Sequence, residues 1–244
     1  MSSRPVTMID TAMVLAAGLG TRMRPLTDTR PKPLVEVAGR SLLDRVLDRL
    51  AAARIGTVVI NVHYLADAIE AAVQRRTEPR TILSDERQRL LDTGGGLRHA
   101  LPLLGPGPFL VQNADCLWID SIGSNLARLA AHWDEDAMDG LLLLAGVQQS
   151  LGYAGRGDFL MDSLGQLTRR PSRIEAPFAF TGCSLAHPRL LDGIESDVFS
   201  LNRAWDRAIE NGRLFGIRLD GLWMHVGTPA DRDLAERALT RGFD

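Results

Sequence analysis

The sequence has few cysteines and no long apolar run. Its 244 residues include two cysteines, Cys116 and Cys183, which provide neither metal-ligand spacing nor a disulfide framework. Such scarcity favours a reducing compartment, and we expect a cytoplasmic protein. No apolar run approaches the ~18 residues that a membrane helix requires, so the sequence predicts no membrane span. The segment from Met1 to Asp10 lacks the apolar core of a signal peptide.

The chain also lacks an excess of charge of either sign. It has 28 basic and 30 acidic residues, a net charge of -2 and a sequence pI of about 6.2. A global positive field that would hold nucleic acid is therefore absent, and we expect no nucleic-acid partner. Apolar residues make up 45% and charged residues 24%, as in ordinary globular domains.

Lysine is almost missing, since the chain has one lysine, Lys32, and 27 arginines. Lys32 lies in the sequence Arg-Pro-Lys-Pro-Leu, residues 30–34. An ammonium group is a compact point charge that fits a narrow pocket beside phosphate oxygens, whereas guanidinium is a rigid planar fork. Composition alone is equally compatible with codon drift that happened to spare one lysine and with a functional role for Lys32. The choice between them depends on the neighbouring residues.

Apolar runs and amphipathic segments alternate over the first 150 residues. Residues 11–17 are predicted to form a buried strand that ends at Gly18, and Ser41 is predicted to cap a helix that extends to Ala53. Further strands are expected at 57–62, 81–83, 109–113 and within 139–147, and helices at 65–76, near 97–101 after a turn at 94–96, and at 122–133. This alternation predicts an α/β fold with a Rossmann-like, doubly wound, mixed but mostly parallel sheet.

The rhythm changes after about residue 150. Short strand-like pieces at 158–161, 178–185 and 214–219 mix with helices near 201–210 and 230–240. No linker rich in proline, glycine or serine separates the two parts, and no internal repeat is present. We therefore expect a single domain over residues 1–244, with one half at about 10–150 and a smaller half at about 151–244 that closes over the first.

The first predicted strand runs into a glycine-rich turn, Leu15-Ala-Ala-Gly-Leu-Gly-Thr-Arg-Met-Arg-Pro-Leu-Thr27. Small residues let backbone N–H groups approach an anion, and the carboxyl end of a strand is where open α/β sheets bind ligands. Met23 stands where a dinucleotide fingerprint needs its third glycine, and the spacing does not fit a Walker loop. A Gly-x-Gly turn alone is most often a plain tight turn.

The whole run is more specific, because the turn is followed by Pro31-Lys32-Pro33-Leu34. The two segments together resemble the fingerprint of the sugar-1-phosphate nucleotidyltransferase family, also called nucleotide-sugar pyrophosphorylases. The resemblance covers most of the chain and thins between residues 150 and 220. It implies an enzyme that condenses a sugar 1-phosphate with a nucleoside triphosphate and releases pyrophosphate, with a nucleotide-binding half at about 10–150 and a sugar-binding half at about 151–244.

The resemblance also implies roles for individual residues. Arg22 is expected to contact the β- and γ-phosphates, and Lys32 to lie between the α-phosphate and the sugar phosphate, so that both serve catalysis. The attacking phosphate oxygen is already ionised, so no general base is expected and positioning with charge neutralisation suffices. The expected nucleotide-binding residues are Ala16, Ala17, Gly18, Gly20, Thr21, Gly94 and Gly95, and the expected sugar-binding residues are Asn113, Gly157 and Thr181.

The family resemblance implies Mg²⁺ as cofactor, held by two residues far apart in the sequence. Asp115 matches the metal-binding aspartate, although an aspartate there is also typical of a strand-end cap. The second acid of the family lies in Trp-x-Asp-x-Gly-Thr, but this chain has Trp223-Met-His225-Val-Gly-Thr228. Because imidazole is a poor Mg²⁺ ligand, the role of His225 stays open between metal contact, phosphate contact and neither.

The choice of substrate is narrowed by the segment Asp92-Thr-Gly-Gly-Gly96, which resembles short uridylyltransferases that act on N-acetylmuramate 1-phosphate. UTP and N-acetylmuramate 1-phosphate are therefore the expected substrates, which implies a part in peptidoglycan recycling. Guanylyl transfer to mannose or heptose 1-phosphate stays open, as does a nucleotide-sugar-binding module with lost chemistry, which only His225 favours. The scarcity of aromatic residues disfavours a phosphocholine cytidylyltransferase. Trp205 is predicted to serve in packing, and a monomer and a homodimer both stay open.

Overall fold

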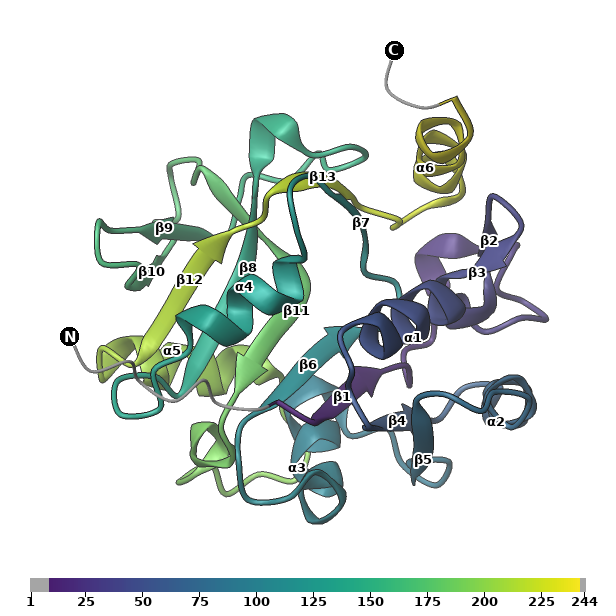
Figure 1. Ribbon diagram of the computed structural model, residues 1–244, viewed down its shortest axis with the longest axis horizontal. Coiled ribbons are helices and arrows are strands. Elements are labelled where there is room, and N and C mark those ends of the chain that lie inside the picture. Colours follow the sequence, from purple (N-terminus) through teal and green to yellow (C-terminus); the bar gives the residue numbers. More distant parts are fainter. Residues whose placement is uncertain (1–8, 242–244) are drawn as a thin grey trace.

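A mixed sheet runs through the computed structural model, which describes residues 9–241 (Figure 1). The expectation for Met1 to Asp10 therefore lies mostly outside the described residues. The described chain forms nine strands of this sheet: β1 (Thr11–Leu15), β4 (Thr57–Val62), β5 (Arg80–Asp85), β6 (Phe109–Asn113), β8 (Gly140–Gly146), β9 (Phe159–Met161), β10 (Leu167–Arg169), β11 (Phe178–Ala186) and β12 (Leu214–Arg218).

The strand order is β12-β8-β11-β6-β1-β4-β5, and β9 with β10 joins the sheet at the start of β11. β1 pairs in parallel with β4 and β6, whereas β11 is antiparallel to both β6 and β8. The second half of the chain thus extends the sheet of the first half through β11. The arrangement confirms the predicted α/β fold with a doubly wound, mixed sheet.

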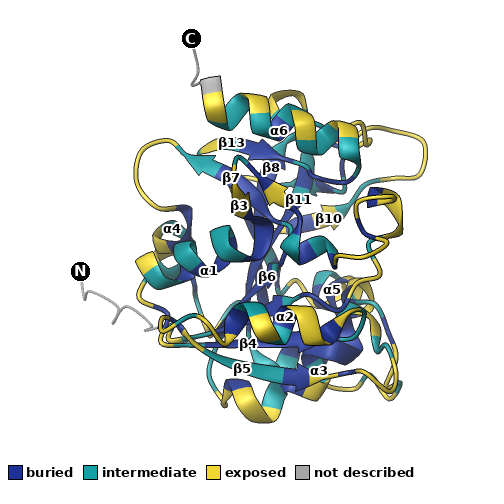
Figure 2. Cartoon of the chain, turned by 90° about the vertical axis from the view of Figure 1, so that its right-hand side faces the viewer, coloured by how far each residue is buried: buried dark blue, intermediate teal, exposed yellow. Residues whose placement is uncertain are grey.

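Helices cover both faces of the sheet. α1 (Leu42–Ala52), α2 (Ala66–Val73) and α4 (Asn125–His132) pack on one face, and α3 (Asp92–Leu104) and α5 (Leu201–Glu210) pack on the other. Central strands such as β4 and β8 are buried on both faces, which explains their continuous apolar sequences (Figure 2). α1 begins as predicted, since the Ser41 hydroxyl accepts a 3.0 Å hydrogen bond from the Asp44 amide.

Two local predictions were wrong. Residues 94–96 lie inside the first turns of α3 rather than in a turn before it, and residue 122 precedes α4, which Ser124 caps. Five strands were not predicted: β10, the short β2 (Glu36–Val37) and β3 (Arg40–Ser41), and β7 (Leu117–Asp120) and β13 (Gly221–Met224). The last two pair with each other outside the main sheet. Their pairing joins residues about 100 positions apart, and such partners leave no local pattern in the sequence.

The last helix, α6 (Pro229–Arg241), packs beside the short hairpin of β2 (Glu36–Val37) and β3 (Arg40–Ser41) (Figure 1). A third apolar cluster lies among this helix, the hairpin and the β7–β13 pair. The Arg232 side chain joins α6 to this hairpin, since its Nε donates to the Glu36 carbonyl at 2.9 Å. The same packing holds the segment after β13 close to the turn after β1.

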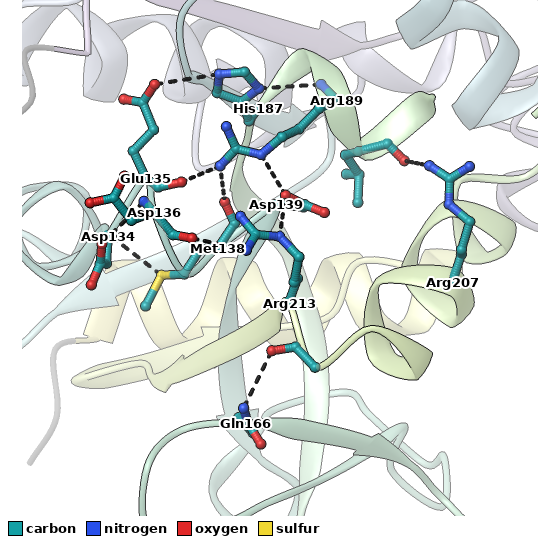
Figure 3. A network of polar contacts seen from close by, with 12 residues as sticks. Asp134, Glu135, Asp136, Met138, Asp139, Gln166, His187, Arg189, Arg207 and Arg213 are labelled. Carbon is teal, nitrogen blue, oxygen red and sulfur yellow. Dashed lines mark hydrogen bonds and ion pairs between the residues drawn. The ribbon is translucent and has the colours of Figure 1, made fainter. Parts of the chain in front are cut away.

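A polar network anchors the ends of β8 and β12 away from that turn (Figure 3). The guanidinium groups of Arg189 and Arg213 donate to Asp139 Oδ1 at 2.6 and 2.8 Å. Burial alone would raise the pKa of Asp139, but the hydrogen bonds from Arg213 and Arg189 outweigh it and lower the pKa. Asp139 therefore stays ionised and fixes the entry of β8.

Across residues 9–241, no helix has the length and apolarity needed to cross a bilayer.

Candidate active site

The turn after β1 offers a row of unused backbone donors. The amide groups of residues 17–22 donate to no acceptor in the described chain. Gly20 has a φ of 64°, and a Cβ there would lie 3.0 Å from Lys32 Cβ, so both conformation and packing require glycine. The Thr27 hydroxyl donates to the Gly20 carbonyl at 2.8 Å and closes the turn. This arrangement is a concave cradle suited to an anion.

Gly18 differs from Gly20 in what surrounds it. A Cβ at Gly18 would have no protein atom within 4 Å, and its φ does not require glycine. The protein itself therefore gives no packing reason for a glycine at this position. The space in front of Gly18 belongs to a cavity of about 640 Å³, so the small residue leaves room for a ligand.

Lys32 lies at the wall of this first cavity and forms an ion pair with Asp115 Oδ2. Pro31 and Pro33 flank it in a short 3-10 helix, which restricts its backbone. The Lys32 side chain is 13% exposed and that of Asp115 is 33% exposed. The pair thus keeps one cation and one carboxylate ready at a partly buried position, where charges act more strongly than in water.

Arg22 lines the same cavity from the 3-10 helix Thr21–Met23 and is exposed. Its guanidinium has no ion-pair partner anywhere in residues 9–241. The structure brings the sequence-predicted residues Ala16, Ala17, Gly18, Gly20, Thr21, Arg22, Lys32, Asn113 and Asp115 to this one cavity. An unpaired guanidinium above unused amides favours a phosphate chain as the ligand.

The pairing of β7 with β13 explains how Asp115 and His225 meet. Leu117 at the start of β7 is opposite Met224 at the end of β13. Asp115 lies two residues before β7 and His225 immediately follows β13, at the same end of the pair. The His225 amide also donates to the Leu151 carbonyl at 2.8 Å, which fixes the backbone at this end.

The imidazole of His225 is partly buried among rings. It lies edge-on to Tyr153 with centroids 5.9 Å apart, and a Cβ at Gly227 would lie 2.5 Å from its Nε2. Burial lowers the pKa of His225; Asp115 opposes this shift, and the positive charge of Lys32 adds to it. The ring is therefore neutral near pH 7 and offers a lone pair.

The side chains near Asp115 fit a metal ion that takes only one or two ligands from the protein and the rest from water and substrate. Within the described residues, no group of three or more His, Cys, Asp or Glu side chains gathers to hold a metal ion. Mg²⁺ is commonly bound by one or two carboxylates, with water and substrate phosphates completing its shell. Asp115 beside an anion cradle meets that requirement, whereas the His225 imidazole suits other divalent metals better than Mg²⁺.

A buried relay supports the turn from below. The Asn61 side chain accepts a 2.7 Å hydrogen bond from the Ala16 amide and donates a 2.7 Å bond to Glu86 Oε1. A Cβ at Gly96 would lie 2.6 Å from that Glu86 oxygen and 2.7 Å from Asn61 Nδ2. Gly96 thus permits α3 to pack on the relay, and sequence reasoning missed both Asn61 and Glu86. A polar residue near the end of an apolar strand was the signal for Asn61.

Gly94 and Gly95 do not line the first cavity. Both amides donate to the Phe199 carbonyl, at 2.9 and 3.1 Å, and added Cβ atoms would collide with Phe199 and with the Asp197 carbonyl. Their glycines are therefore explained by the close approach of the segment before α5. Asp92 and Thr93, which precede them, line the cavity instead, and Asp92 has a positive φ of 62°.

A second cavity of about 380 Å³ adjoins the first and shares Leu15, Asp92, Thr93 and Asn113 with it. Its remaining wall is rich in aromatic side chains, with a few polar groups. These residues are Val111, Tyr153, Asp158, Phe159, Arg169, Phe180, Ser200, Leu201, Asn202, Trp205, Trp223 and His225. Trp205 packs as predicted and in addition contributes to this wall.

The predicted residues Gly157 and Thr181 are each one position away from this wall. Thr181 lies on the opposite face of β11, where its hydroxyl donates to the Leu143 carbonyl at 2.8 Å, and Phe180 faces the cavity. Gly157 has a φ of 74° and packs on Ala176, while Asp158 lines the cavity. Contact of Gly157 and Thr181 with a sugar therefore stays a prediction, and the structure adds their neighbours Asp158 and Phe180 as residues of the wall.

The chain matches a known family and several curated relatives. A model of the MobA-like NTP transferase domain matches residues 12–161. N-acetylmuramate alpha-1-phosphate uridylyltransferase of Caulobacter vibrioides is 46% identical over 232 residues, covering 93% of this chain and 96% of that protein. The protein of the same name from Neisseria meningitidis is 37% identical over 221 residues, covering 89% and 93%.

More distant matches extend to other sugar-phosphate enzymes. Mannose-1-phosphate guanyltransferase of Aspergillus oryzae is 31% identical over 232 residues, covering 90% of this chain and 61% of that protein. The crystal structure of HddC from Yersinia pseudotuberculosis complexed with GMP-PN has a TM-score of 0.75 at 19% identity, covering 95% of this chain and 100% of that one. At that identity the structural match establishes the fold alone.

Proposed function

The chain belongs to the MobA-like NTP transferase domain family, and from this membership we propose that it joins UTP to N-acetylmuramate 1-phosphate. The products are UDP-N-acetylmuramate and pyrophosphate. The chain is a nucleotidyltransferase, and the names of its two uridylyltransferase relatives support this substrate pair. The proposal includes action in the cytoplasm and a part in peptidoglycan recycling.

The continuity of the two cavities carries the proposal. The first has unused amides and cations for a triphosphate, and the second has aromatic walls for a sugar ring. Asn113 and Thr93 line both, so a ligand in one cavity lies next to a ligand in the other. Two substrates held in adjoining spaces gain the advantage of proximity without any covalent intermediate.

In the proposed reaction, a sugar-phosphate oxygen attacks the α-phosphorus of UTP and pyrophosphate leaves. The turn amides from Ala17 to Thr21 and the Arg22 guanidinium hold the leaving phosphates. Lys32 neutralises charge between the attacking phosphate and the α-phosphate. The attacking oxygen is ionised near pH 7, so no residue is needed as a base, and catalysis rests on position and charge.

Asp115, which lines the first cavity beside Lys32, would hold Mg²⁺ through its carboxylate. The ion would supply charge neutralisation at the phosphates when bound. The ring of His225 is close enough to Asp115 for that charge to affect its pKa, and we assign His225 a minor share in holding the ion. Asn113, which lines both cavities, would contact the sugar substrate.

Purified protein with Mg²⁺, UTP and N-acetylmuramate 1-phosphate is expected to release pyrophosphate. A panel of UTP, GTP, CTP and dTTP checks the base, because a pocket that pairs one base leaves its polar groups unpaired with another. Turnover with GTP and mannose 1-phosphate but not with the proposed pair would favour guanylyl transfer, which the Aspergillus relative represents. Tight nucleotide-sugar binding without turnover under any divalent metal would favour a binding module.

Gly18→Ala and Gly96→Ala are expected to act differently. The first adds a methyl group to open cavity space, so the KM for UTP should rise about tenfold while the melting temperature stays unchanged. The second drives a methyl group into Glu86 and Asn61, so the free energy of unfolding should fall by ~1–3 kcal/mol. Gly107→Ala, with no atom within 4 Å, is the matched control. A large loss of stability in Gly18→Ala would contradict a ligand-based reason for that glycine.

A further inference from the structure

The second cavity contains a cation that the phosphate chemistry does not use. Arg169 is the only lysine or arginine among the described residues that line it. The groups assigned to the phosphates, Arg22 and Lys32, line the first cavity. A neutral sugar ring offers hydroxyl and amide groups but no anion, whereas a sugar that carries an acid group offers an anion that this guanidinium can bind.

Arg169 is held in place on several sides. Its Nε donates to Asp206 Oδ1 at 2.6 Å, and its Nη2 donates to the Asn202 side chain at 3.0 Å. The guanidinium carbon lies 4.8 Å from the Phe159 ring centroid and 5.8 Å from that of Trp205. A side chain restrained in this way loses little further entropy when it binds a ligand.

One end of the guanidinium remains available. Nη1 of Arg169 has no hydrogen-bond partner in the part of the chain that the structure describes, and the side chain is 33% exposed. Nη1 carries two N–H donors, and a charge-assisted hydrogen bond from one of them to a carboxylate oxygen is stronger than a neutral one. The structure thus offers a fixed, partly buried donor pair in the second cavity.

The other charged side chains of this wall restrict where an anion can lie. Asp92 and Asp158 both line the cavity, and Asp158 Oδ2 already accepts the Phe180 amide at 2.9 Å. A ligand carboxylate is repelled near these acids and attracted at Arg169. The charges therefore favour one orientation of a sugar that carries an acid group.

We propose that Arg169 binds the carboxylate of the lactyl ether of N-acetylmuramate 1-phosphate and thereby selects this sugar over N-acetylglucosamine 1-phosphate. The inference rests on the proposed function, because the two sugars differ only in that lactyl group. Arg169 is a specificity-determining residue in this account. It contacts the distal end of the sugar and does not reach the reacting phosphates.

The test compares kcat and KM for both sugar phosphates with UTP and Mg²⁺. In Arg169→Gln, the preference for N-acetylmuramate 1-phosphate is expected to fall about 10- to 100-fold, the size of one charge-assisted pair. The loss should appear in the KM for that sugar and should be much smaller with N-acetylglucosamine 1-phosphate. Arg169→Lys keeps the positive charge but not the planar guanidinium. Its preference for N-acetylmuramate 1-phosphate should lie between those of the unaltered protein and Arg169→Gln. Arg203→Gln, an exposed arginine on α5 outside the cavity, is the matched control.

A second measurement uses the unaltered protein, so that a folding defect cannot obscure the result. The carboxamide analogue of N-acetylmuramate 1-phosphate lacks the negative charge and should have a KM raised by a similar factor. An unchanged preference in a folded Arg169→Gln, or equal KM values for the acid and its amide, would overturn the inference. Absence of turnover with N-acetylmuramate 1-phosphate in the unaltered protein would instead reject the proposed function.

Discussion

Lys32→Met is expected to lower kcat for nucleotide-sugar formation by about 10²–10³-fold, the cost of removing one fixed donor from a developing charge. Methionine fills the volume of the lysine stem but cannot neutralise the phosphates. The free energy of unfolding should change by no more than ~1 kcal/mol, because the partner Asp115 is 33% exposed and retains solvent. Pyrophosphate release measures the rate, and thermal unfolding measures the stability.

Arg30→Met provides the control for this change. Arg30 is also a cation beside a proline, but its side chain is 51% exposed, pairs with Glu36 and does not line either cavity. Its loss should leave kcat within about twofold of the unaltered protein, as expected for a surface pair. Near-normal turnover in Lys32→Met would remove Lys32 from the catalytic role.

Asp115→Asn is expected to lower kcat about 10²–10³-fold and to raise the Mg²⁺ concentration needed for half-maximal rate by at least about tenfold. Asparagine keeps the shape of the side chain but removes the charge that attracts the metal. The substitution also leaves the Lys32 ammonium unpaired. The local structure would therefore be disturbed whether Asp115 is a strand-end cap or a metal ligand. Only a metal ligand changes the dependence of the rate on Mg²⁺, and this titration is therefore the decisive measurement.

Two companion variants sharpen the result for Asp115. His225→Ala should raise the Mg²⁺ requirement much less than Asp115→Asn, because imidazole is a weak Mg²⁺ ligand. Asp67→Asn removes an acid on α2 that is 95% exposed and lines neither cavity, and it should leave the titration unchanged. If Asp115→Asn kept the Mg²⁺ requirement of the unaltered protein, Asp115 would be a partner of Lys32 alone.

The strands and helices with strong local patterns were predictable. β4, β6 and α5 occur over the predicted residues, because a run of apolar residues or a 3.6-residue period is contained in a single segment. The turn from Ala16 to Thr21 was predictable for the same reason. Its glycines, Arg22 and the Pro-Lys-Pro segment lie within 20 residues, and they come together in one cavity.

Residues whose place depends on a partner far along the chain were not predictable. Phe180 and Thr181 are neighbours in β11, and only the packing of the sheet decides that Phe180 faces the cavity. Gly94 and Gly95 were predicted to bind the nucleotide, and only the structure reveals that Phe199 and Asp197 also give a packing reason for these two glycines. Close approach between distant segments is invisible in a single stretch of sequence.

The sequence by itself determined the glycine-rich turn, the lone lysine that follows it and the family, because these depend on contiguous residues and their backbone conformation. Only the tertiary structure decided the second cavity and the meeting of Asp115 with His225. The cavity draws on segments from Leu15 to His225, and the meeting depends on the β7–β13 register. Arg169 became a candidate for sugar selection for the same reason, because only the folded sheet places it in the wall of the second cavity.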